Sequence, residues 1–227
     1  MNEFVFSYIF SVIIQAVSLV IQGFGYTMQV HPSLRTLKYA LNIEFFVSFV
    51  EIMVYLWIGT NLVNLKSVMK KRYLDWVITT NALMFSFSFL FHFFYERQNK
   101  TEINTQQFIR ESIPKMRPIV LFNTLMLVCG YLGELNSVPR YVSFTSGFAF
   151  FFASFYYLYH YFAKYTNIGK YVFYAIAFIW SLYGVSHTLT EKWKNVSYNI
   201  LDLISKNVFG VIFVFMLIHY NKIESSL

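Results

Sequence analysis

The sequence is poor in cysteine, proline and charge, and each shortage excludes a class of protein. A single cysteine, Cys129, rules out an intrachain disulfide and a metal site built from several cysteines. Only 13% of the 227 residues are charged, whereas 57% are hydrophobic and 22% are aromatic. That balance lies outside the range of soluble domains. The four prolines are expected between or at the edges of the long apolar segments, where they do not interrupt a helix interior.

The sequence also lacks the motifs of enzymes and of nucleic-acid binding. It contains no cluster of metal ligands, no nucleophile elbow and no phosphate-binding loop, so we do not expect an enzyme. The net charge is +7, but the aromatic residues lie within apolar segments rather than on a basic face. Nucleic acid is therefore not an expected partner, and the positive charge fits the loops of a membrane protein.

Seven apolar segments are each long enough to cross a bilayer as a helix. They cover about residues 3–25, 39–64, 73–95, 118–135, 140–163, 170–190 and 196–220. Lysine and arginine residues outside these spans are more numerous on the side of the C-terminus, which predicts that the N-terminus is outside and the C-terminus cytoplasmic. The predicted fold is an all-α membrane protein, a seven-transmembrane-helix bundle with residues 1–227 in a single domain.

The longest connection between the predicted spans covers residues 96–117 and is polar, with charges of both signs. A connection of this length and composition predicts a cytoplasmic loop that contains a short surface helix. A docking site for an effector is the alternative interpretation of the same segment.

Six ionisable residues fall within or at the edge of the predicted spans. They are Glu44, Glu51, Arg72, Asp75, Asp202 and Lys206. Ionisable groups inside a membrane are costly and usually belong to functional sites. Ion pairs that only hold helices together are the structural alternative.

Lys206 lies in the middle of the last apolar span, one helical turn after Asp202. An ionised lysine at the bilayer centre costs roughly 2.5–3.5 kcal/mol, and a carboxylate four residues earlier lies on the same helix face and offsets that charge. A lysine amine also forms Schiff bases with carbonyl compounds. A buried lysine with a carboxylate partner in a helical membrane protein therefore points to covalently held retinal.

A polar stripe runs along the third span, where Arg72, Asp75, Thr79 and Ser86 recur at helical spacing. The segment RYLDWVITT in this span, together with D-x-x-x-K in the seventh, resembles the microbial (type 1) rhodopsins. Trp180 and Tyr183, in the segment WSLYG, fall where that family packs an aromatic pair around retinal. The resemblance covers all seven spans in number and order.

The resemblance implies a role for each matching residue. Lys206 would carry all-trans retinal as a protonated Schiff base, with Asp75 as primary counterion and proton acceptor and Asp202 as second counterion. Arg72 would keep both carboxylates ionised, and Thr79 would form a hydrogen bond near Asp75. The expected pocket walls are Trp76, Thr80, Trp180 and Tyr183.

The sequence departs from the family pattern at several positions. Ser86 stands where outward proton pumps often keep a carboxylic proton donor, and serine stores protons poorly. His187 replaces an aromatic residue expected near the ring end of the retinal pocket. Lys194 and Asn195 stand in the region where the family usually has glutamates for extracellular proton release.

Additional polar residues are predicted to share faces of the first, second and seventh helices. If these faces meet, they form a polar column between the two membrane surfaces, which includes two of the six ionisable residues. Its predicted members are Ser11, Gln15, Glu44, Glu51, Asn195, Asn199 and Asn207. The set resembles the viral rhodopsins of giant algal viruses, some of which resemble cation channels. Interhelical hydrogen bonding is the alternative role of each residue taken singly.

The leading functional hypothesis from the sequence is light-driven ion transport, with outward proton transfer from the Lys206 Schiff base through Asp75. The alternative is a light-gated cation channel that uses Glu44, Glu51, Asn195 and Asn199, and the second alternative is a photosensory receptor. The expected partners are the lipid bilayer and protons or small cations, and a homo-oligomer is compatible with the pattern. The expected location is a multi-pass integral membrane protein, in a host cell membrane if the chain is viral.

Overall fold

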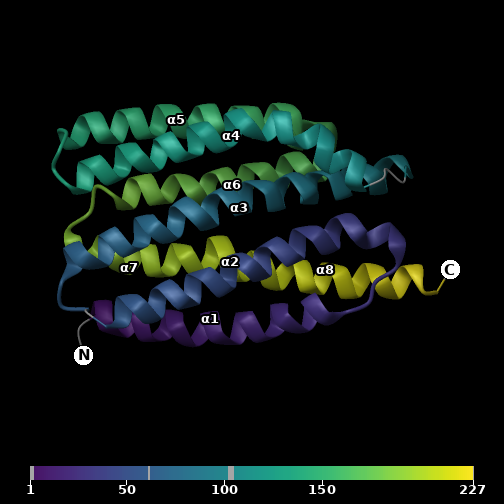
Figure 1. The fold of residues 1–227 in the computed structure, drawn as a ribbon, viewed down its shortest axis with the longest axis horizontal. Coiled ribbons are helices and arrows are strands. Elements are labelled where there is room, and N and C mark those ends of the chain that lie inside the picture. The colour runs from purple at the N-terminus through teal and green to yellow at the C-terminus, as the bar shows by residue number, and fades with distance from the viewer. Residues whose placement is uncertain (1–2, 61, 102–104, 227) are drawn as a thin grey trace.

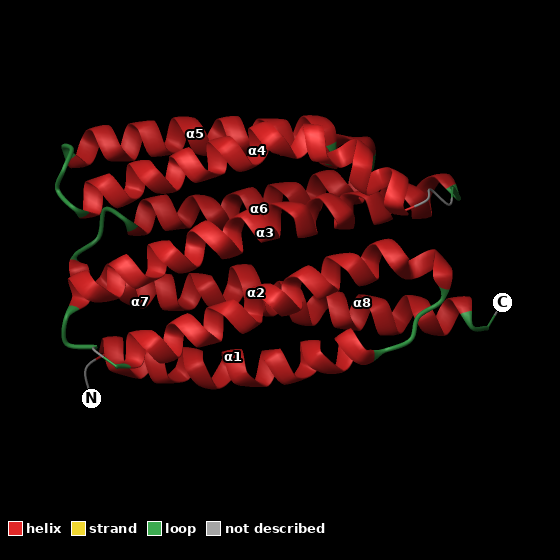
Figure 2. Cartoon of the chain, in the orientation of Figure 1, coloured by secondary structure: helices red, strands yellow, loops and turns green. Residues whose placement is uncertain are grey.

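The computed structural model describes residues 3–60, 62–101 and 105–226, and the described chain folds as an elongated bundle of helices (Figure 1). No strand occurs among these residues, as the secondary-structure view shows (Figure 2). The first and last described residues lie at opposite ends of the bundle (Figure 1). The predicted all-helical membrane fold is therefore confirmed.

Seven helical rods follow one another within the described residues. The first six are α1 (Glu3–Thr27), α2 (Arg35–Gly59), α3 (Leu65–Asn99), α4 (Thr105–Glu134), α5 (Arg140–Tyr161) and α6 (Asn167–Ser186). The seventh rod is built from α7 (Glu191–Asp202), a π-helical stretch η3 (Leu203–Val208) and α8 (Phe209–Glu224). Two short 3₁₀ turns, η1 (Pro32–Leu34) and η2 (Ala163–Tyr165), precede α2 and α6.

Local side-chain chemistry determines several helix ends. The side chain of Asn64 accepts a hydrogen bond from the backbone of Ser67 at 3.1 Å and begins α3, as N-cap residues do. Thr166 begins α6 in the same way, through Gly169 N at 3.0 Å. At the end of α1, the Lys38 ammonium donates to the carbonyls of Gly25, Tyr26 and Met28, which satisfies acceptors that a helix end leaves unpaired.

Six stretches of the described chain are long and apolar enough to cross a membrane. They lie in α1, α2, α3, α4, α6 and the combined rod of α7, η3 and α8. The remaining rod, α5, has 22 residues, five of which are tyrosines, and these lower its hydropathy. The outward faces carry exposed apolar side chains such as Phe6, Val20 and Phe152, as expected for a lipid-facing surface.

The prediction of a long loop at residues 96–117 is wrong. Helix α3 continues to Asn99 and α4 begins at Thr105, so Pro114 and Pro118 lie inside α4; positions 102–104 lie outside the described residues. The reason is a buried face at helical spacing, which includes Phe108, Ser112 and Met116. The ring of Phe108 stacks on His92 of α3 with centroids 3.8 Å apart, and this packing extends the helix beyond the apolar span.

The predicted span boundaries need smaller corrections elsewhere. Helix α2 begins at Arg35 and ends at Gly59 rather than covering residues 39–64, of which position 61 lies outside the described residues. Helix α3 begins at Leu65, eight residues before the predicted start at 73 (73 − 65 = 8). Charged and polar end residues lower the hydropathy of a span, but they still form helical turns that project beyond the apolar layer.

Candidate functional site

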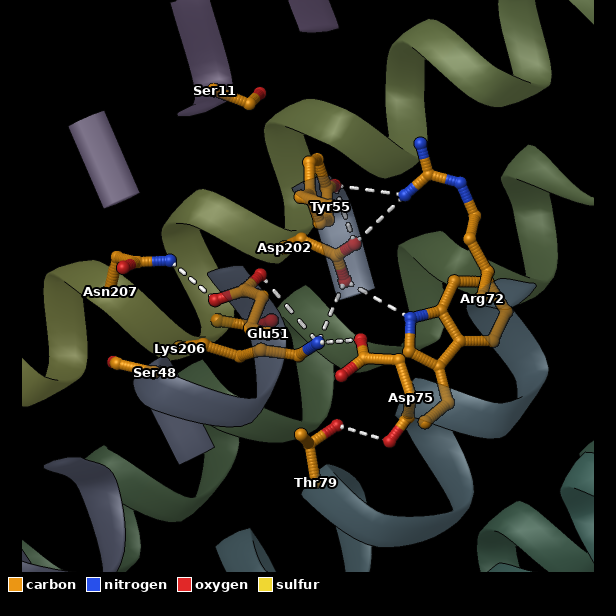
Figure 3. A network of polar contacts seen from close by, with 12 residues as sticks. Ser11, Ser48, Glu51, Tyr55, Arg72, Asp75, Thr79, Asp202, Lys206 and Asn207 are labelled. Atoms are coloured by element: carbon orange, nitrogen blue, oxygen red, sulfur yellow. Dashed lines mark hydrogen bonds and ion pairs between the residues drawn. The ribbon is translucent and has the colours of Figure 1, made fainter. Parts of the chain in front are cut away.

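The Lys206 ammonium lies at the centre of a buried group of carboxylates (Figure 3). It donates a hydrogen bond to Asp75 Oδ2 at 2.7 Å. Asp202 Oδ1 lies 3.4 Å from the same nitrogen, and Glu51 Oε1 lies 3.6 Å away. Helices α2, α3 and the seventh rod thus each bring one carboxylate to a single lysine. Glu51 was predicted as part of an ion path, and its contact with Lys206 was not foreseen.

The backbone around Lys206 is not a regular α-helix. Residues Leu203–Val208 form a π-helical stretch between α7 and α8. A π-helical turn inserts an extra residue into the i→i+4 pattern, and such insertions frequently occur at functional sites. Asp202 directly precedes this stretch and Lys206 lies within it, and their side chains still meet, with Asp202 Oδ1 3.4 Å from the Lys206 nitrogen.

Asp202 accepts hydrogen bonds from four side chains. Its Oδ2 atom accepts from Arg72 Nη1 at 3.0 Å and from Tyr55 OH at 2.8 Å. Its Oδ1 atom accepts from Trp76 Nε1 at 3.2 Å and from Tyr183 OH at 2.9 Å. A carboxylate with this many donors is strongly favoured in its charged form, and Arg72 supplies a full positive charge to the group.

Asp75 and Thr79, two other predicted site residues of α3, make fewer hydrogen bonds than Asp202. Asp75 Oδ2 bonds to Lys206, whereas Asp75 Oδ1 has no hydrogen-bond partner among the described residues. Thr79 donates to the main-chain carbonyl of Asp75 at 2.9 Å rather than to its carboxylate. Around Lys206 the site therefore holds two cations, Lys206 and Arg72, and the carboxylates of Glu51, Asp75 and Asp202.

A cavity is lined by Lys206 at one side and by residues of α3, α4, α5, α6 and α7 around it. Its walls include the four predicted pocket residues Trp76, Thr80, Trp180 and Tyr183. His187, expected near the ring end of the pocket, is also a wall, whereas sequence reasoning did not identify Leu83, Met126, Phe148, Phe151 and Ser205. Rigid apolar and aromatic walls around one polar attachment point suit a long polyene. The residues present therefore fit a retinal that is joined to Lys206.

Polar side chains fill the space on the other side of Lys206, where α1 meets α2 and the seventh rod. Ser11 and Gln15 are buried on α1, as predicted, together with the unpredicted Ser7, Ser18 and Gln22. These five positions follow one another at intervals of three or four residues and therefore form one continuous face of the helix.

Hydrogen bonds join this face of α1 to its neighbours. Asn199 Nδ2 donates to Ser7 Oγ at 2.8 Å, and Ser11 Oγ donates to the Asn199 carbonyl at 3.3 Å. Further along, Ser18 donates to the Asn207 carbonyl at 3.1 Å. Asn207 Nδ2 in turn donates to Glu51 Oε2 at 2.7 Å. The predicted members Ser11, Glu51, Asn199 and Asn207 are thus brought together.

Several amide atoms in the same region have no hydrogen-bond partner among the described residues. Both side-chain polar atoms of Gln15 are in this state, although Gln15 is fully buried. The same holds for Gln22 Oε1 and Asn207 Oδ1. Buried polar groups nearly always find partners, so these atoms are suited to contact water or a passing ion.

Two predicted members of the ion path lie apart from this network. Asn195 is buried, but its side chain donates only to the Glu191 carbonyl, one turn earlier in α7. Glu44 of α2 accepts a hydrogen bond from Ser86 of α3 at 2.6 Å. The Ser86 position thus has a buried carboxyl next to it, supplied by the neighbouring helix rather than by α3.

A seven-helix membrane bundle with a lysine buried between carboxylates and an aromatic cavity has the architecture of a retinal-binding membrane protein. The sequence model of the bacteriorhodopsin-like proteins matches residues 6–220. The chain therefore belongs to the bacteriorhodopsin-like family, which implies retinal bound to a lysine through a Schiff base. It is an integral, multi-pass membrane protein.

Solved structures of microbial rhodopsins share this fold. The viral rhodopsin OLPVRII is 25% identical, with a TM-score of 0.79, and the match covers 96% of this chain and 97% of that one. The blue light-absorbing proteorhodopsin from Med12 is 19% identical, with a TM-score of 0.72 and coverage of 96% and 97%. The light-driven proton pump from Coccomyxa subellipsoidea is 20% identical, with a TM-score of 0.71 and coverage of 95% and 97%. A comparison with curated protein sequences finds no match.

Proposed function

We propose that residues 1–227 form one retinal-binding domain that moves ions across a membrane in response to light, with the N-terminus outside and the C-terminus in the cytoplasm. Lys206 holds all-trans retinal as a protonated Schiff base, and Asp75 and Asp202 balance its charge. One observation supports Lys206 as the attachment site. Its ammonium lies between three carboxylates and at the end of the aromatic cavity.

When bound, retinal would supply the absorption of visible light and a change of shape that reorients the Lys206 nitrogen within the pocket. Asp75 is the group placed to receive a proton at that moment, since its Oδ2 atom already lies 2.7 Å from the Lys206 nitrogen. Asp202 is less suited to accept a proton, because four donors hold its two oxygens. The two carboxylates thus have different roles, although both form ion pairs with Lys206.

We infer that small cations pass between α1, α2 and the seventh rod. The single observation that favours this mode is the continuous polar face of α1, with Ser7, Ser18 and Gln22 in addition to the predicted Ser11 and Gln15. Proton transfer from Lys206 to Asp75 uses none of these five side chains. A buried polar row that contains unpartnered amide atoms and is joined through Asn207 to Glu51 is suited to exchange the hydration shell of a cation.

Outward proton transport, the leading hypothesis from the sequence, remains the second candidate. It is favoured by the Lys206–Asp75 hydrogen bond and by the buried Glu44 carboxyl beside Ser86. Glu44 would supply protons from the cytoplasmic side, in place of a carboxylic residue at position 86. This route runs through α2 and α3 and does not require the polar face of α1.

Voltage-clamp recording from illuminated membranes that contain the retinal-loaded protein distinguishes the two modes. For cation conduction, the current is zero when there is no driving force and reverses when the cation gradient is reversed. For outward proton transport, an outward current persists at zero driving force. An inward or absent current under every gradient would contradict both candidates.

A further inference from the structure

A second buried group of charges lies at the end of the bundle where α4 and α6 finish and α7 begins. Glu134 closes α4, His187 follows α6, and Lys194 lies in the second turn of α7. His187 Nδ1 is 3.0 Å from Glu134 Oε1, and Lys194 Nζ is 2.7 Å from Glu134 Oε2. Lys194 is fully buried, and His187 is only 6% exposed. We call these three residues the His187 cluster.

His187 also belongs to the wall of the retinal cavity. Gly130, Ser143 and Gly147 of α4 and α5 line the cavity with it, whereas Lys206 lines it from the seventh rod. The cavity therefore connects the Lys206 ammonium to the His187 cluster. The Nδ1 atom of the imidazole contacts the Glu134 carboxylate, whereas its Nε2 atom is buried and has no hydrogen-bond partner among the described residues.

Few other charges face this imidazole. Glu134 of α4 pairs with Lys194 of α7. The Lys194 nitrogen also lies 3.6 Å from Oε1 of Glu191, the first residue of α7. Tyr73 of α3 and Tyr198 of α7 line the same cavity, and Arg140 begins α5 at this end of the bundle. Because Glu134 and Lys194 compensate each other, the proton on His187 decides whether the cluster carries a net positive charge.

We propose that the His187 cluster is a colour-setting site, which adjusts the wavelength absorbed by the retinal that the proposed function places on Lys206. Excitation of a protonated retinal imine shifts positive charge from the nitrogen towards the far end of the polyene. A positive charge at that far end opposes the shift and moves absorption to shorter wavelength, and a negative charge does the reverse. Inside an apolar cavity such interactions are weakly screened.

The same geometry makes the colour depend on the protonation of His187. A proton on the imidazole adds a positive charge at the far end of the cavity. Absorption then moves to shorter wavelength. Protonation of Asp75 or Asp202 has the opposite effect, because it removes negative charge beside the nitrogen. The direction in which acid moves the visible band therefore tells whether His187 or a carboxylate beside Lys206 has gained the proton.

Charge-removing variants test the colour-setting site through the direction of their shifts. We expect Glu134→Gln to move the visible band to shorter wavelength and Lys194→Gln to move it to longer wavelength. The double variant should lie near the wild type, and it leaves no unpaired charge that would prevent folding. Shifts of the same direction in both single variants, or a strongly shifted double variant, would overturn the proposal.

Acid titration of the visible band tests the role of His187 itself. In the wild type, acidification should produce a component that moves to shorter wavelength, and His187→Phe should lose it. His219→Phe is the matched control, because His219 is exposed on α8, away from the cavity, and this variant should titrate as the wild type does. Persistence of the component in His187→Phe would refute the assignment.

Nuclear magnetic resonance of the retinal-free protein, labelled with ¹⁵N at histidine, gives a readout that needs no chromophore. Glu134→Gln should move the ring-nitrogen signals of His187 and leave those of His219 in place. If added retinal gave no visible band, the proposed function would fail while this measurement still reported the His187–Glu134 contact. Unchanged His187 signals in Glu134→Gln would contradict the cluster independently.

Discussion

The two sides of the bundle are filled with different kinds of side chain. Between α1, α2 and the seventh rod, the buried residues include serines, glutamines and asparagines joined by hydrogen bonds. Between α3, α4, α5 and α6, the interior is mainly aromatic, with Phe87, Phe151, Phe155 and Trp180 packed against one another. Lys206 lies on the boundary, with Glu51 on one side and the cavity on the other.

Under the proposed function, this difference separates the holding of retinal from the passage of ions. An aromatic interior holds an apolar chromophore and excludes water, whereas a polar interior in a membrane is costly and is kept for the movement of ions. The α1 helix shows the contrast within one element, because its apolar side chains face outward while its polar ones face inward. Lys206 and its carboxylates contact both sides, so they would couple light absorption to ion movement.

The largest expected effect comes from removing the boundary residue. Lys206→Ala eliminates the amine to which we propose that retinal is joined, so the visible band and every light-dependent current should disappear. Lys222→Ala, at an exposed position near the end of α8, is the matched control and should keep both. The visible band is measured by absorption spectroscopy of membranes reconstituted with all-trans retinal. A coloured, photoactive Lys206→Ala protein without added amine would show that another group holds the chromophore.

A smaller effect is expected from weakening the charge balance around Lys206. Asp75→Asn removes the carboxylate that lies 2.7 Å from the Lys206 nitrogen, so the visible band should move to longer wavelength. Glu51→Gln should produce a smaller shift in the same direction, because Glu51 lies 3.6 Å away. Spectra of the two variants at the same pH provide the comparison. An equal or larger shift in Glu51→Gln would mean that Glu51 is the principal counterion.

The smallest expected effect concerns the buried carboxyl of Glu44 beside Ser86. Glu44→Gln weakens the 2.6 Å hydrogen bond from Ser86 and removes a potential proton donor. We expect it to abolish any light-driven current at zero driving force and to leave the gradient-driven cation current unchanged. Ser86→Ala retains the carboxyl and serves as the control. Loss of the gradient-driven current in Glu44→Gln alone would place Glu44 in the cation path.

Sequence reasoning predicted the seven helices, because apolar spans of about 20 residues are a strong signal. The meeting of Asp75, Asp202 and Lys206 was also expected, since two of these residues lie one helical turn apart and the third belongs to a motif. The contact between Glu51 and Lys206 joins two residues that are 155 positions apart in the chain (206 − 51 = 155). Spacing within one helix carries no information about such a contact.

Other features were missed for identifiable physical reasons. The π-helical stretch at Leu203–Val208 leaves no composition signal, because it depends on how the seventh rod packs. The signal for Ser7, Ser18 and Gln22 was present in the intervals between polar residues of α1, but only Ser11 and Gln15 were identified. The long α3 and α4 were shortened because polar end turns were interpreted as a loop. Helix packing overrode composition at those ends.

The most direct test of the division between the two sides measures photocurrent and absorption on the same membranes for Gln15→Leu. Leucine removes the amide atoms that lie unpartnered in the polar face of α1 and does not touch the retinal cavity. We predict a gradient-driven photocurrent at least about tenfold smaller, the loss that about 1.4 kcal/mol of added barrier produces, with an unchanged visible band. Val17→Leu, on the exposed face of the same helix, should match the wild type. A wild-type photocurrent in Gln15→Leu would contradict the account.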